Sequence, residues 1–417
     1  MTAWVLMGLS AALLIGALLL STYTQDKIAK IPLNIDTTLV SEGTGTGLDP
    51  VSLAPPPRRE GEPIPGDETC GRVPFSIDKN VPMTFQQQVT VEAPANADVV
   101  TLQVGSTLRR VDKQKDTGLL LALVDFVTLD RKTAVAVEDP PGSLQGPKPM
   151  EDPTTTPASP TAAPTPSISP LPHEGLAYRF PFGTEKKTYA FFDPIAQKPY
   201  DANYDGEEDV NGLTTYKFTQ NVGYDADGKI VDPVKYPSLY PDGVDGQVTA
   251  VASQWGLGGD PCEPIAMTRY YVAQRAFWVD PVSGTIVKSE DHGYHYFARD
   301  QVEPEVTYVD YKVTSSEDTV ESQVASARDE RDRVALWGRI LPISFTALGL
   351  LALVAGGALA YFTFRAESAL IDPGLDQPAH GFFGRRPTDS GPMPAAEAQT
   401  EKLPTQRPSD QPPDRPV

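Results

Sequence analysis

The stretch ILPISFTALGLLALVAGGALAYFTF, residues Ile340–Phe364, decides how this chain is arranged, together with a second apolar stretch, MTAWVLMGLSAALLIGALLL, at Met1–Leu20. A helix of about 20 apolar residues crosses the hydrocarbon core of a bilayer. Neither stretch carries a charged residue. We therefore expect transmembrane helices at residues 1–21 and 340–364, which hold the chain between them on one side of a membrane as a single tethered body.

The first stretch has a second interpretation, as a cleaved signal peptide. Such peptides have a positive n-region and a small-residue cleavage site. Here no Lys or Arg precedes the apolar run, and the chain continues as STYTQDK without an Ala-x-Ala pattern. We favour an uncleaved anchor, which places both termini on the same side of the membrane.

Both apolar stretches carry small residues four positions apart. Such stripes allow helix backbones to approach closely in lipid, although Gly is frequent in spanning helices in any case. The stripes are therefore candidate docking surfaces, for each other or for a partner membrane protein; they consist of Gly8, Ala12 and Gly16, and of Ala352, Gly356 and Ala360.

The compartment of residues 22–314 follows from two further features. Cys70 and Cys262 fit one disulfide of an oxidising compartment, with two unrelated buried thiols as the alternative. Residues 153–172, PTTTPASPTAAPTPSISPLP, resemble an extended stalk outside the cell. We expect an extracytoplasmic (periplasmic) domain that the disulfide closes across a disordered insert at about 140–172, and a disordered cytoplasmic tail at 365–417.

The domain itself is predicted to be mainly β: a curved antiparallel sheet held between the two transmembrane helices. Runs rich in Val, Tyr, Phe and Thr, bounded by Gly, Asp, Asn or Pro, are typical of strands. These runs are 84–92, 117–129, 133–138, 187–192, 214–220, 247–253, 268–279, 284–290, 293–299 and 306–313. Residues 315–339 predict a juxtamembrane helix, with Ser315 and Asp318 resembling a capping box.

Few residues suggest chemistry. The net charge of −20 excludes a basic nucleic-acid footprint. His292 and His295 stand three apart on a predicted strand, so they point to opposite faces and do not form a metal site. The run Asp201–Asp209, DANYDGEED, begins like a calcium loop, but Gly212 stands where the closing Glu is needed, so we interpret it as a solvated acidic turn. We expect no enzyme activity, no cofactor and no metal.

Two motifs carry a resemblance to a known family. Residues 278–287, WVDPVSGTIV, resemble a W-V-D-P-x-[ST]-G-x-I-V signature, and residues 211–218, NGLTTYKF, resemble G-L-x-T-Y-x-F. With its two apolar stretches, the chain is similar to the actinobacterial "PorA family porin" family, formerly a domain of unknown function. Physically, Asp280–Gly284 predicts a tight hairpin turn in which glycine supplies a positive φ.

The resemblance implies a cell-envelope protein of mycolic-acid-containing bacteria, similar to a mycobacterial polar growth factor that partners the trehalose monomycolate flippase. We expect a non-enzymatic envelope-assembly factor that binds or passes a lipid or glycolipid and docks an inner-membrane lipid transporter. The alternative is a structural scaffold without lipid; a porin or hydrolase is less favoured, because helices rather than barrel strands provide the anchor. The candidate apolar groove comprises Tyr270, Tyr271, Phe277, Trp278, Tyr294, Tyr296 and Phe297.

Overall fold

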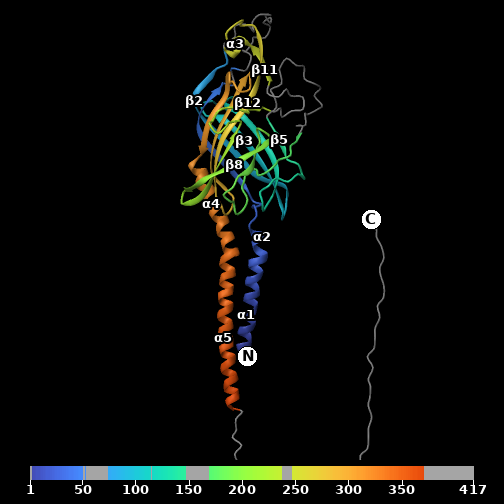
Figure 1. Cartoon of the computed structure of the whole chain (residues 1–417), viewed down its shortest axis with the longest axis vertical. Helices are drawn as coiled ribbons and strands as arrows, with labels where there is room; N and C mark the ends of the chain where they lie inside the picture. Colours follow the sequence, from blue (N-terminus) through green and yellow to red (C-terminus); the bar gives the residue numbers. More distant parts are fainter. Residues whose placement is uncertain are drawn as a thin grey trace, which may run out of the picture. The chain divides into compact units, whose positions relative to one another are not determined.

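The structure is a computed structural model that describes residues 2–49, 52, 74–113, 115–146, 169–236 and 247–370. Its strands form one 14-stranded sheet, in which the named pairs are antiparallel (Figure 1). The strands are β1 (Asp36–Leu48), β2 (Ile77–Ala95), β3 (Val99–Arg110), β4 (Leu119–Asp130), β5 (Ser143–Gln145), β6 (Ser169–Pro170), β7 (Tyr189–Asp193), β8 (Lys198–Val210), β9 (Leu213–Val222), β10 (Val234–Lys235), β11 (Gln247–Val251), β12 (Pro264–Val279), β13 (Ile286–Ala298) and β14 (Val306–Ser315). The prediction of a curved, mainly β structure between two apolar helices is confirmed.

The order of the strands is β6-β5-β4-β3-β2-β1-β14-β13-β12-β9-β8-β7, with β10 and β11 both pairing with β12. The first strand, β1, therefore pairs with the last, β14, and the two lie in the middle of the sheet. Because β1 follows the N-terminal helix and β14 precedes the C-terminal one, both apolar helices are attached to the centre of the sheet.

Single-residue bridges connect the two ends of this curved sheet. Leu176 bridges to Phe191 of β7 on one side and to Val135 on the other, and Ala136 bridges to Leu129 of β4. Residues 133–138, predicted as a strand, make only these bridges. The segment around Leu176 thus connects the two edges where the sheet curls round.

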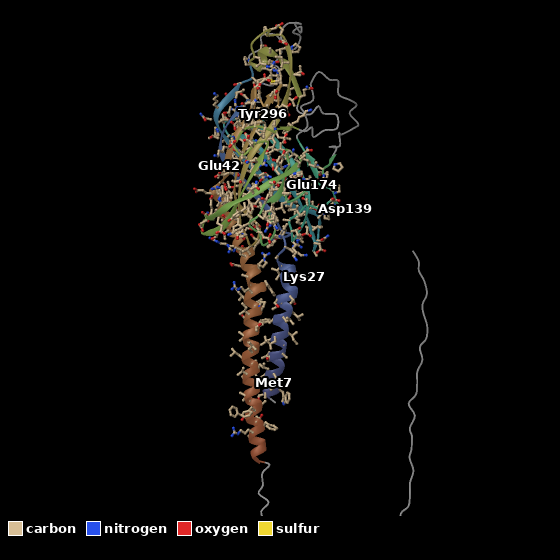
Figure 2. All side chains as sticks on the ribbon, viewed as in Figure 1. Met7, Lys27, Glu42, Asp139, Glu174 and Tyr296 are labelled. Carbon is tan, nitrogen blue, oxygen red and sulfur yellow. The ribbon has the colours of Figure 1, made fainter. Side chains whose placement is uncertain are left out.

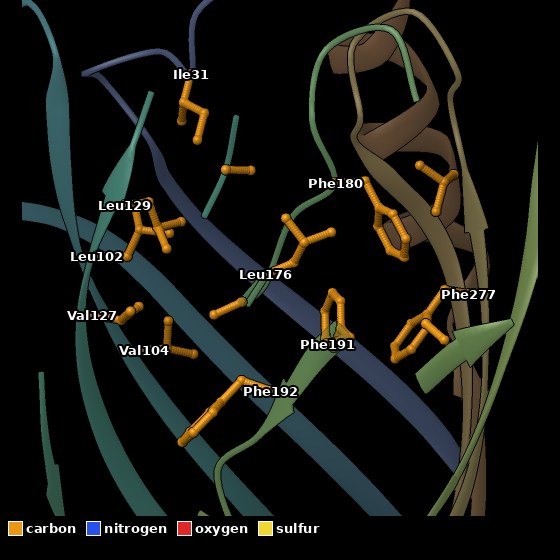
Figure 3. Packing of buried hydrophobic residues seen from close by; sticks show 14 of the residues in the cluster. Ile31, Leu102, Val104, Val127, Leu129, Leu176, Phe180, Phe191, Phe192 and Phe277 are labelled. Atoms are coloured by element: carbon orange, nitrogen blue, oxygen red, sulfur yellow. The ribbon is translucent and has the colours of Figure 1, made fainter. Parts of the chain in front are cut away.

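Buried aromatic and aliphatic side chains fill part of the space inside the curve (Figure 3). Phe180 is fully buried; its ring lies 4.7 Å from that of Phe218 and 5.3 Å from that of Phe191. Leu176 and Ile31 belong to the same cluster. The core is thus closed by the crossing segment at 176–180 as well as by the strands.

The hairpin turn between β12 and β13 has the predicted form. The Asp280 amide donates to the Thr285 carbonyl, and the Gly284 amide donates to the Asp280 carbonyl. Gly284 has φ +76°, and a Cβ there would lie 2.1 Å from the Phe180 carbonyl oxygen. Glycine is required both for the backbone conformation and for the close approach of the core segment.

The C-terminal helical segment is α4 (Glu317–Ala335), a π turn η4 (Leu336–Ile340) and α5 (Leu341–Leu370). The helix cap is Ser316, whose side chain accepts from the Thr319 amide, so the predicted cap at Ser315 is one residue early.

The N-terminal segment is α1 (Thr2–Leu19), a π turn η1 (Leu20–Thr24) and α2 (Gln25–Ile28). Two helical segments, Thr2–Thr22 and one within Glu317–Ala366, are long and apolar enough to cross a membrane. Oxygen and nitrogen atoms are dense over the strands and sparse along α1 and α5 (Figure 2).

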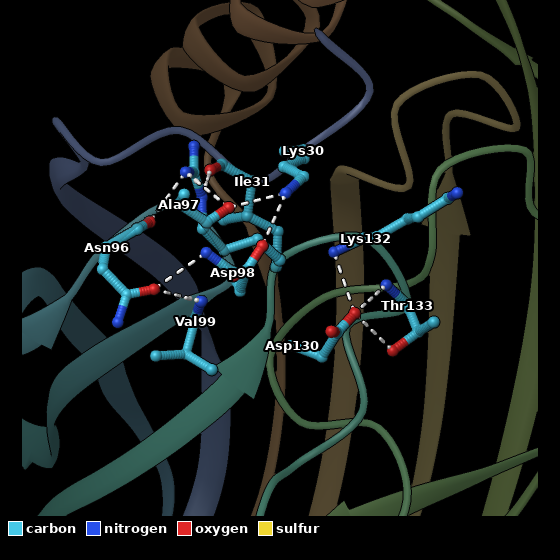
Figure 4. A network of polar contacts seen from close by, with 10 residues as sticks. Lys30, Ile31, Asn96, Ala97, Asp98, Val99, Asp130, Lys132 and Thr133 are labelled. Carbon is cyan, nitrogen blue, oxygen red and sulfur yellow. Dashed lines mark hydrogen bonds and ion pairs between the residues drawn. The ribbon is translucent and has the colours of Figure 1, made fainter. Parts of the chain in front are cut away.

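A polar network attaches the chain after α2 to the sheet (Figure 4). The Lys30 Nζ donates to the Ala97 carbonyl at 2.6 Å and pairs with Asp98 at 3.1 Å. Arg131 and Ile31 exchange hydrogen bonds, from the Ile31 amide to the Arg131 carbonyl and from the Arg131 Nε to the Ile31 carbonyl, each 2.8 Å long. The start of β1 is therefore fixed against the β2–β3 and β4 turns.

One sequence-based interpretation is wrong. The acidic run Asp201–Asp209 is not a turn but most of strand β8, which pairs with β7 and β9. Ala202 is fully buried, whereas the alternate residues Asp201, Asn203 and Asp205 are exposed. The period-2 alternation of a half-buried strand prevails over the low strand propensity of Asp and Asn.

Candidate functional site: a cavity inside the curved sheet

A cavity of about 210 Å³ lies inside the curve of the sheet, between the core cluster of Figure 3 and the side chains around Tyr311. Successive inward-facing residues of β1, namely Ile35 just before it, Thr37, Leu39 and Ser41, line one wall. The remaining lining comes from β2–β5, from the residues between Tyr178 and Ile195, from Tyr236, from β12–β14 with Thr285 before β13, and from the first turns of α4. On a comparable scale, an engineered apolar cavity of about 150 Å³ takes up benzene.

The walls are largely apolar and reachable by solvent. Leu39, Phe85, Leu121 and Leu123 face the cavity, yet each is only partly buried. Packed interiors leave few voids larger than a water molecule. These inward-facing apolar side chains therefore border space that packing does not fill.

A buried polar centre lies at one side of this space. Arg275 lines the cavity and pairs with Asp193, whose side chain is fully buried. Asp193 also accepts from the amides of Ile195 and Ala196 at 2.7 Å and from the Tyr271 hydroxyl at 3.0 Å. Asp193 is thus satisfied by structural partners and positions Arg275.

Asp291 completes the polar centre with weaker contacts. Its Oδ1 lies 3.3 Å from Arg275 Nε, and its Oδ2 accepts from the Tyr311 hydroxyl at 3.4 Å. Burial raises the pKa of Asp291, although the Arg275 guanidinium lowers it. Since Asp291 lines the cavity and 14% of its side chain is exposed, it is open to a guest or to water.

The other cations that line the cavity are neutralised by their own carboxylates. Arg179 forms a short ion pair with Glu330 of α4. The Lys288 Nζ lies 3.7 Å from Glu290. The polar part of the lining consequently offers paired charges rather than a free cation, and the site has no strong preference for an anion on charge grounds.

A second buried polar cluster holds the ends of the predicted insert. His173 Nε2 lies 3.0 Å from Asp125 Oδ1, and His173 Nδ1 lies 3.0 Å from the Leu171 carbonyl oxygen. The Tyr178 hydroxyl donates to Asp125, and burial together with this carboxylate raises the pKa of Tyr178 well above its usual value. Strands β5 and β6 lie within the insert predicted at about 140–172 and pair with each other beside this cluster, so the two ends of that insert are ordered and the prediction was too wide. Residues 147–168 lie outside the described residues.

Near Tyr236, another cavity-lining residue, Arg269 lies between two tyrosine rings. Its guanidinium carbon is 4.1 Å from the Tyr236 ring centre and 3.8 Å from that of Tyr308. Burial lowers the pKa of His295 well below its usual value, with the charges of Arg269 and Arg275 adding to the effect. His295 is therefore neutral, and its Nδ1 accepts from Arg269 at 3.3 Å.

The structure distributes the predicted groove aromatics over several places. Phe277 lines the cavity, and Tyr271 is buried at the polar centre. Trp278 packs against α4, and Phe297 against Trp255. The remaining three form a separate cluster with Val272 and Ala298: Tyr270, Tyr294 and Tyr296. Much of the other lining comes instead from β1–β4 and from the consecutive residues 286–291 at the start of β13.

The predicted docking residues on the helices also separate into two groups. On α5, Gly356 is buried and Ala352 and Ala360 are half-buried. A Cβ on Gly356 would lie 3.2 Å from Leu6 Cβ, so this stripe packs on α1. On α1, Gly8 and Ala12 are exposed and Gly16 is half-buried. The buried residues of α1 are Ala3, Ser10 and Ala17, and Ser10 donates to the Gly349 carbonyl at 2.8 Å.

The histidine and cysteine predictions have different outcomes. His292 is part-exposed and pairs with Asp310 at 2.9 Å, while His295 is buried on the opposite face, as the strand spacing predicts. Within the described ranges, no three His, Cys, Asp or Glu side chains converge in a way that could hold a metal ion. Cys70 lies outside the described residues, so the Cys70–Cys262 disulfide stays a prediction.

Comparison with known proteins identifies the family. Residues 2–358 match the family described as Porin PorA. A Porin PorA of Corynebacterium amycolatum is 28% identical over 397 residues, covering 87% of this chain and 97% of that protein. A Porin PorA of Corynebacterium resistens is 30% identical over 410 residues, covering 86% and 96%. The two apolar helices and these relatives make this a membrane-associated protein, and the chain belongs to the Porin PorA family.

Proposed function

We propose that the protein is a membrane-anchored, non-enzymatic cell-envelope assembly factor whose curved sheet holds the apolar chain of a lipid or glycolipid. The cavity carries this proposal: a space of about 210 Å³ inside the sheet, walled by Leu39, Phe85, Leu121 and Leu123, which are only partly buried. Leaving such side chains uncovered costs about 25 cal/mol for each Å² of apolar surface, which a bound hydrocarbon chain would recover. Trehalose monomycolate is the candidate ligand that the family resemblance suggests.

The proposed topology has two spans, with both termini in the cytoplasm and the sheet outside the cytoplasmic membrane. It rests on the lengths of α1 and α5, on the cysteine pair and on the Pro/Thr-rich tract at 153–172. The helices would also provide the docking surface for an inner-membrane lipid transporter of the mycolate flippase type. The exposed Gly8 and Ala12 face of α1 is the candidate surface, because α5 already covers the opposite face.

Two other functions make distinct demands on this structure. A scaffold that binds no lipid needs no cavity, so a solid core would have favoured it. A porin, the function that the family name suggests, needs strands whose outer faces are apolar over a lipid-facing band. On β8 the outward positions are Asp201, Asn203, Asp205 and Glu207, all exposed, which favours water over lipid on that strand. Ion conductance of the purified protein in planar bilayers would support the porin and refute our proposal.

Photo-crosslinking tests the proposal directly. Full-length protein in nanodiscs is mixed with 1-palmitoylglycerol that carries a diazirine in its chain, illuminated, and mapped by mass spectrometry. We expect crosslinks on inward-facing residues of β1–β4. The substitution Leu121→Trp, which fills the cavity, should remove most of them, whereas Lys312→Trp on the exposed side of β14 should not. Crosslinks confined to α1 and α5 would show that the cavity holds no lipid.

A further inference from the structure

The sheet has a gap beside its central strand. β14 pairs with β1 only from Ser41 to Gly47 of β1, and with β13 only from Glu290 to Phe297 of β13. β1 begins earlier, at Asp36, and β13 begins earlier, at Ile286. The central strand β14 ends at Ser315, so it does not reach the first residues of β1 and β13. Residues 36–40 of β1 and 286–289 of β13 therefore border a space that β14 leaves between them.

The start of α4 covers part of this gap and contacts both of its sides: Val287 of β13 packs against Val320 and Val324, and two hydrogen bonds join α4 to β1. The Ser316 amide donates to the Val40 carbonyl at 2.8 Å, and the Val40 amide donates to the Thr319 hydroxyl at 2.9 Å. In the described part of the chain, no strand pairs with the β14-facing edges of residues 36–39 or 286–288. Adjacent strands lie about 4.8 Å apart, so a missing strand separates its neighbours by roughly 10 Å. Since α4 takes up part of that width, the candidate opening is the part beside Thr37 and Leu39 of β1.

The cavity extends to this gap. Thr37 and Leu39 of β1, Ser289 of β13 and Gln323 of α4 all line it, and all four are partly exposed to solvent. Three of the four side chains are polar but uncharged. Such a rim is hydrated without holding a fixed charge that an apolar chain would have to desolvate.

We propose that this gap, bordered by Thr37, Leu39, Ser289 and Gln323, is the portal through which a ligand enters and leaves the cavity. The inference rests on the proposed function, since a portal has meaning only if the cavity is occupied. A portal controls the rates of binding and release without touching the bound ligand. A change at its rim therefore slows both rates equally and leaves the equilibrium occupancy unaltered, whereas a change inside the cavity alters occupancy.

The test blocks the portal with a covalent plug. Gln323→Cys is modified with fluorescein maleimide in full-length protein in nanodiscs, under non-reducing conditions, and the unsubstituted protein reports any labelling at Cys70 or Cys262. Glu321→Cys, exposed on α4 and away from the cavity, is the matched control. The rate at which cavity crosslinks to the diazirine-bearing 1-palmitoylglycerol appear after mixing, and the rate at which they disappear on dilution, are then measured.

We expect the plug at Gln323 to slow both rates at least tenfold with the final crosslink yield unchanged, while the labelled Glu321→Cys protein and the unlabelled Gln323→Cys protein behave like the wild type. Rates within twofold of the wild type in fully labelled Gln323→Cys protein would overturn the portal. Slowing only by a plug at Ile195→Cys, a cavity-lining residue that does not border the gap, would overturn it too. A wild-type protein that gives no cavity crosslinks would instead refute the proposed function, and the portal with it.

Discussion

The buried ion pair between Arg179 and Glu330 gives the sharpest prediction about how α4 is held on the sheet. Arg179 is in the segment that crosses between the edges of the sheet, and its guanidinium also donates to the Ser283 carbonyl at 2.9 Å. The two side chains are 10% and 7% exposed. Removing one member of a buried pair costs about 3–5 kcal/mol, because the other charge is left buried and alone.

We expect Glu330→Met to lower the free energy of local opening of α4 by about 3 kcal/mol, the low end of that range, because Arg179 keeps its bond to Ser283. Each 1.4 kcal/mol is a tenfold change in an equilibrium constant, so amide hydrogen exchange along α4 should speed up by roughly a hundredfold. Arg179→Met should have a similar effect. The double variant should lose far less than the sum of the two, since an apolar pair of similar volume is often neutral.

Native-state hydrogen exchange of the full-length protein in nanodiscs, read peptide by peptide by mass spectrometry, measures these openings. Arg333→Met removes an exposed cation from the same helix and should change exchange by less than about threefold. The reasoning fails if Glu330→Met exchanges no faster than this control. It also fails if the two single effects simply add in the double variant, because no coupling would then exist between the residues.

Three further substitutions test other parts of the structure by thermal unfolding. Phe180→Ala should cost about 4 kcal/mol, since this ring is fully buried and stacked on Phe218; a loss below about 1 kcal/mol would contradict the packing of the core. Gly284→Ala should cost at least about 2 kcal/mol, because φ is +76° and the new Cβ would meet the Phe180 carbonyl oxygen; an unchanged melting temperature would refute the turn geometry. Asp291→Asn should stabilise the protein at pH 7.5, with the gain vanishing as the pH falls toward 4. The sign follows because burial raises the pKa of Asp291, so folding favours its protonated form, and the wild-type protein loses stability as the pH rises through this raised pKa. A gain that grows in acid would show the opposite shift.

Much of the sheet is readable from sequence because most of its strands carry period-2 patterns of β-branched and aromatic residues. The strands missed were the long β1, β3 and β8 and the short β5, β6 and β10. Strand β1, DTTLVSEGTGTGL, contains three glycines and two carboxylates, residue types that are depleted in strands. Two of those glycines, Gly43 and Gly45, allow close approach: a Cβ would lie 1.9 Å from the Lys312 carbonyl oxygen and 2.3 Å from the Asp310 carbonyl oxygen. Local propensity gives no sign of such a tertiary requirement.

The cavity was only partly foreseeable for a related reason. The predicted groove was placed on β12 and β13 because these strands are rich in aromatic residues. Aromatic residues are as common in a packed core as in a ligand site. The informative signal was a charged residue at an inward position of an apolar strand: Arg275 stands in TRYYVAQRAFWV between inward-facing Ala273 and Phe277. Its partners Asp193 and Asp291 lie 82 residues before it and 16 after it along the chain. No spacing rule brings such residues together; the order of the strands does.

The family motif gains a physical explanation from its position. The turn at Asp280–Thr285 lies against the buried segment around Phe180 and against α4, where Arg331 lies 3.4 Å from Asp280. The same turn receives Arg179 at the Ser283 carbonyl. A hairpin turn alone needs none of these contacts with α4, which continues into the apolar helix α5. The turn therefore acts as a clamp on the C-terminal half of α4, through Arg331 directly and through Arg179, which pairs with Glu330. The N-terminal turns of α4 border the proposed portal. If the clamp is weakened, as in Glu330→Met, the portal should open more easily, so faster hydrogen exchange of α4 and faster ligand exchange should occur in the same variant.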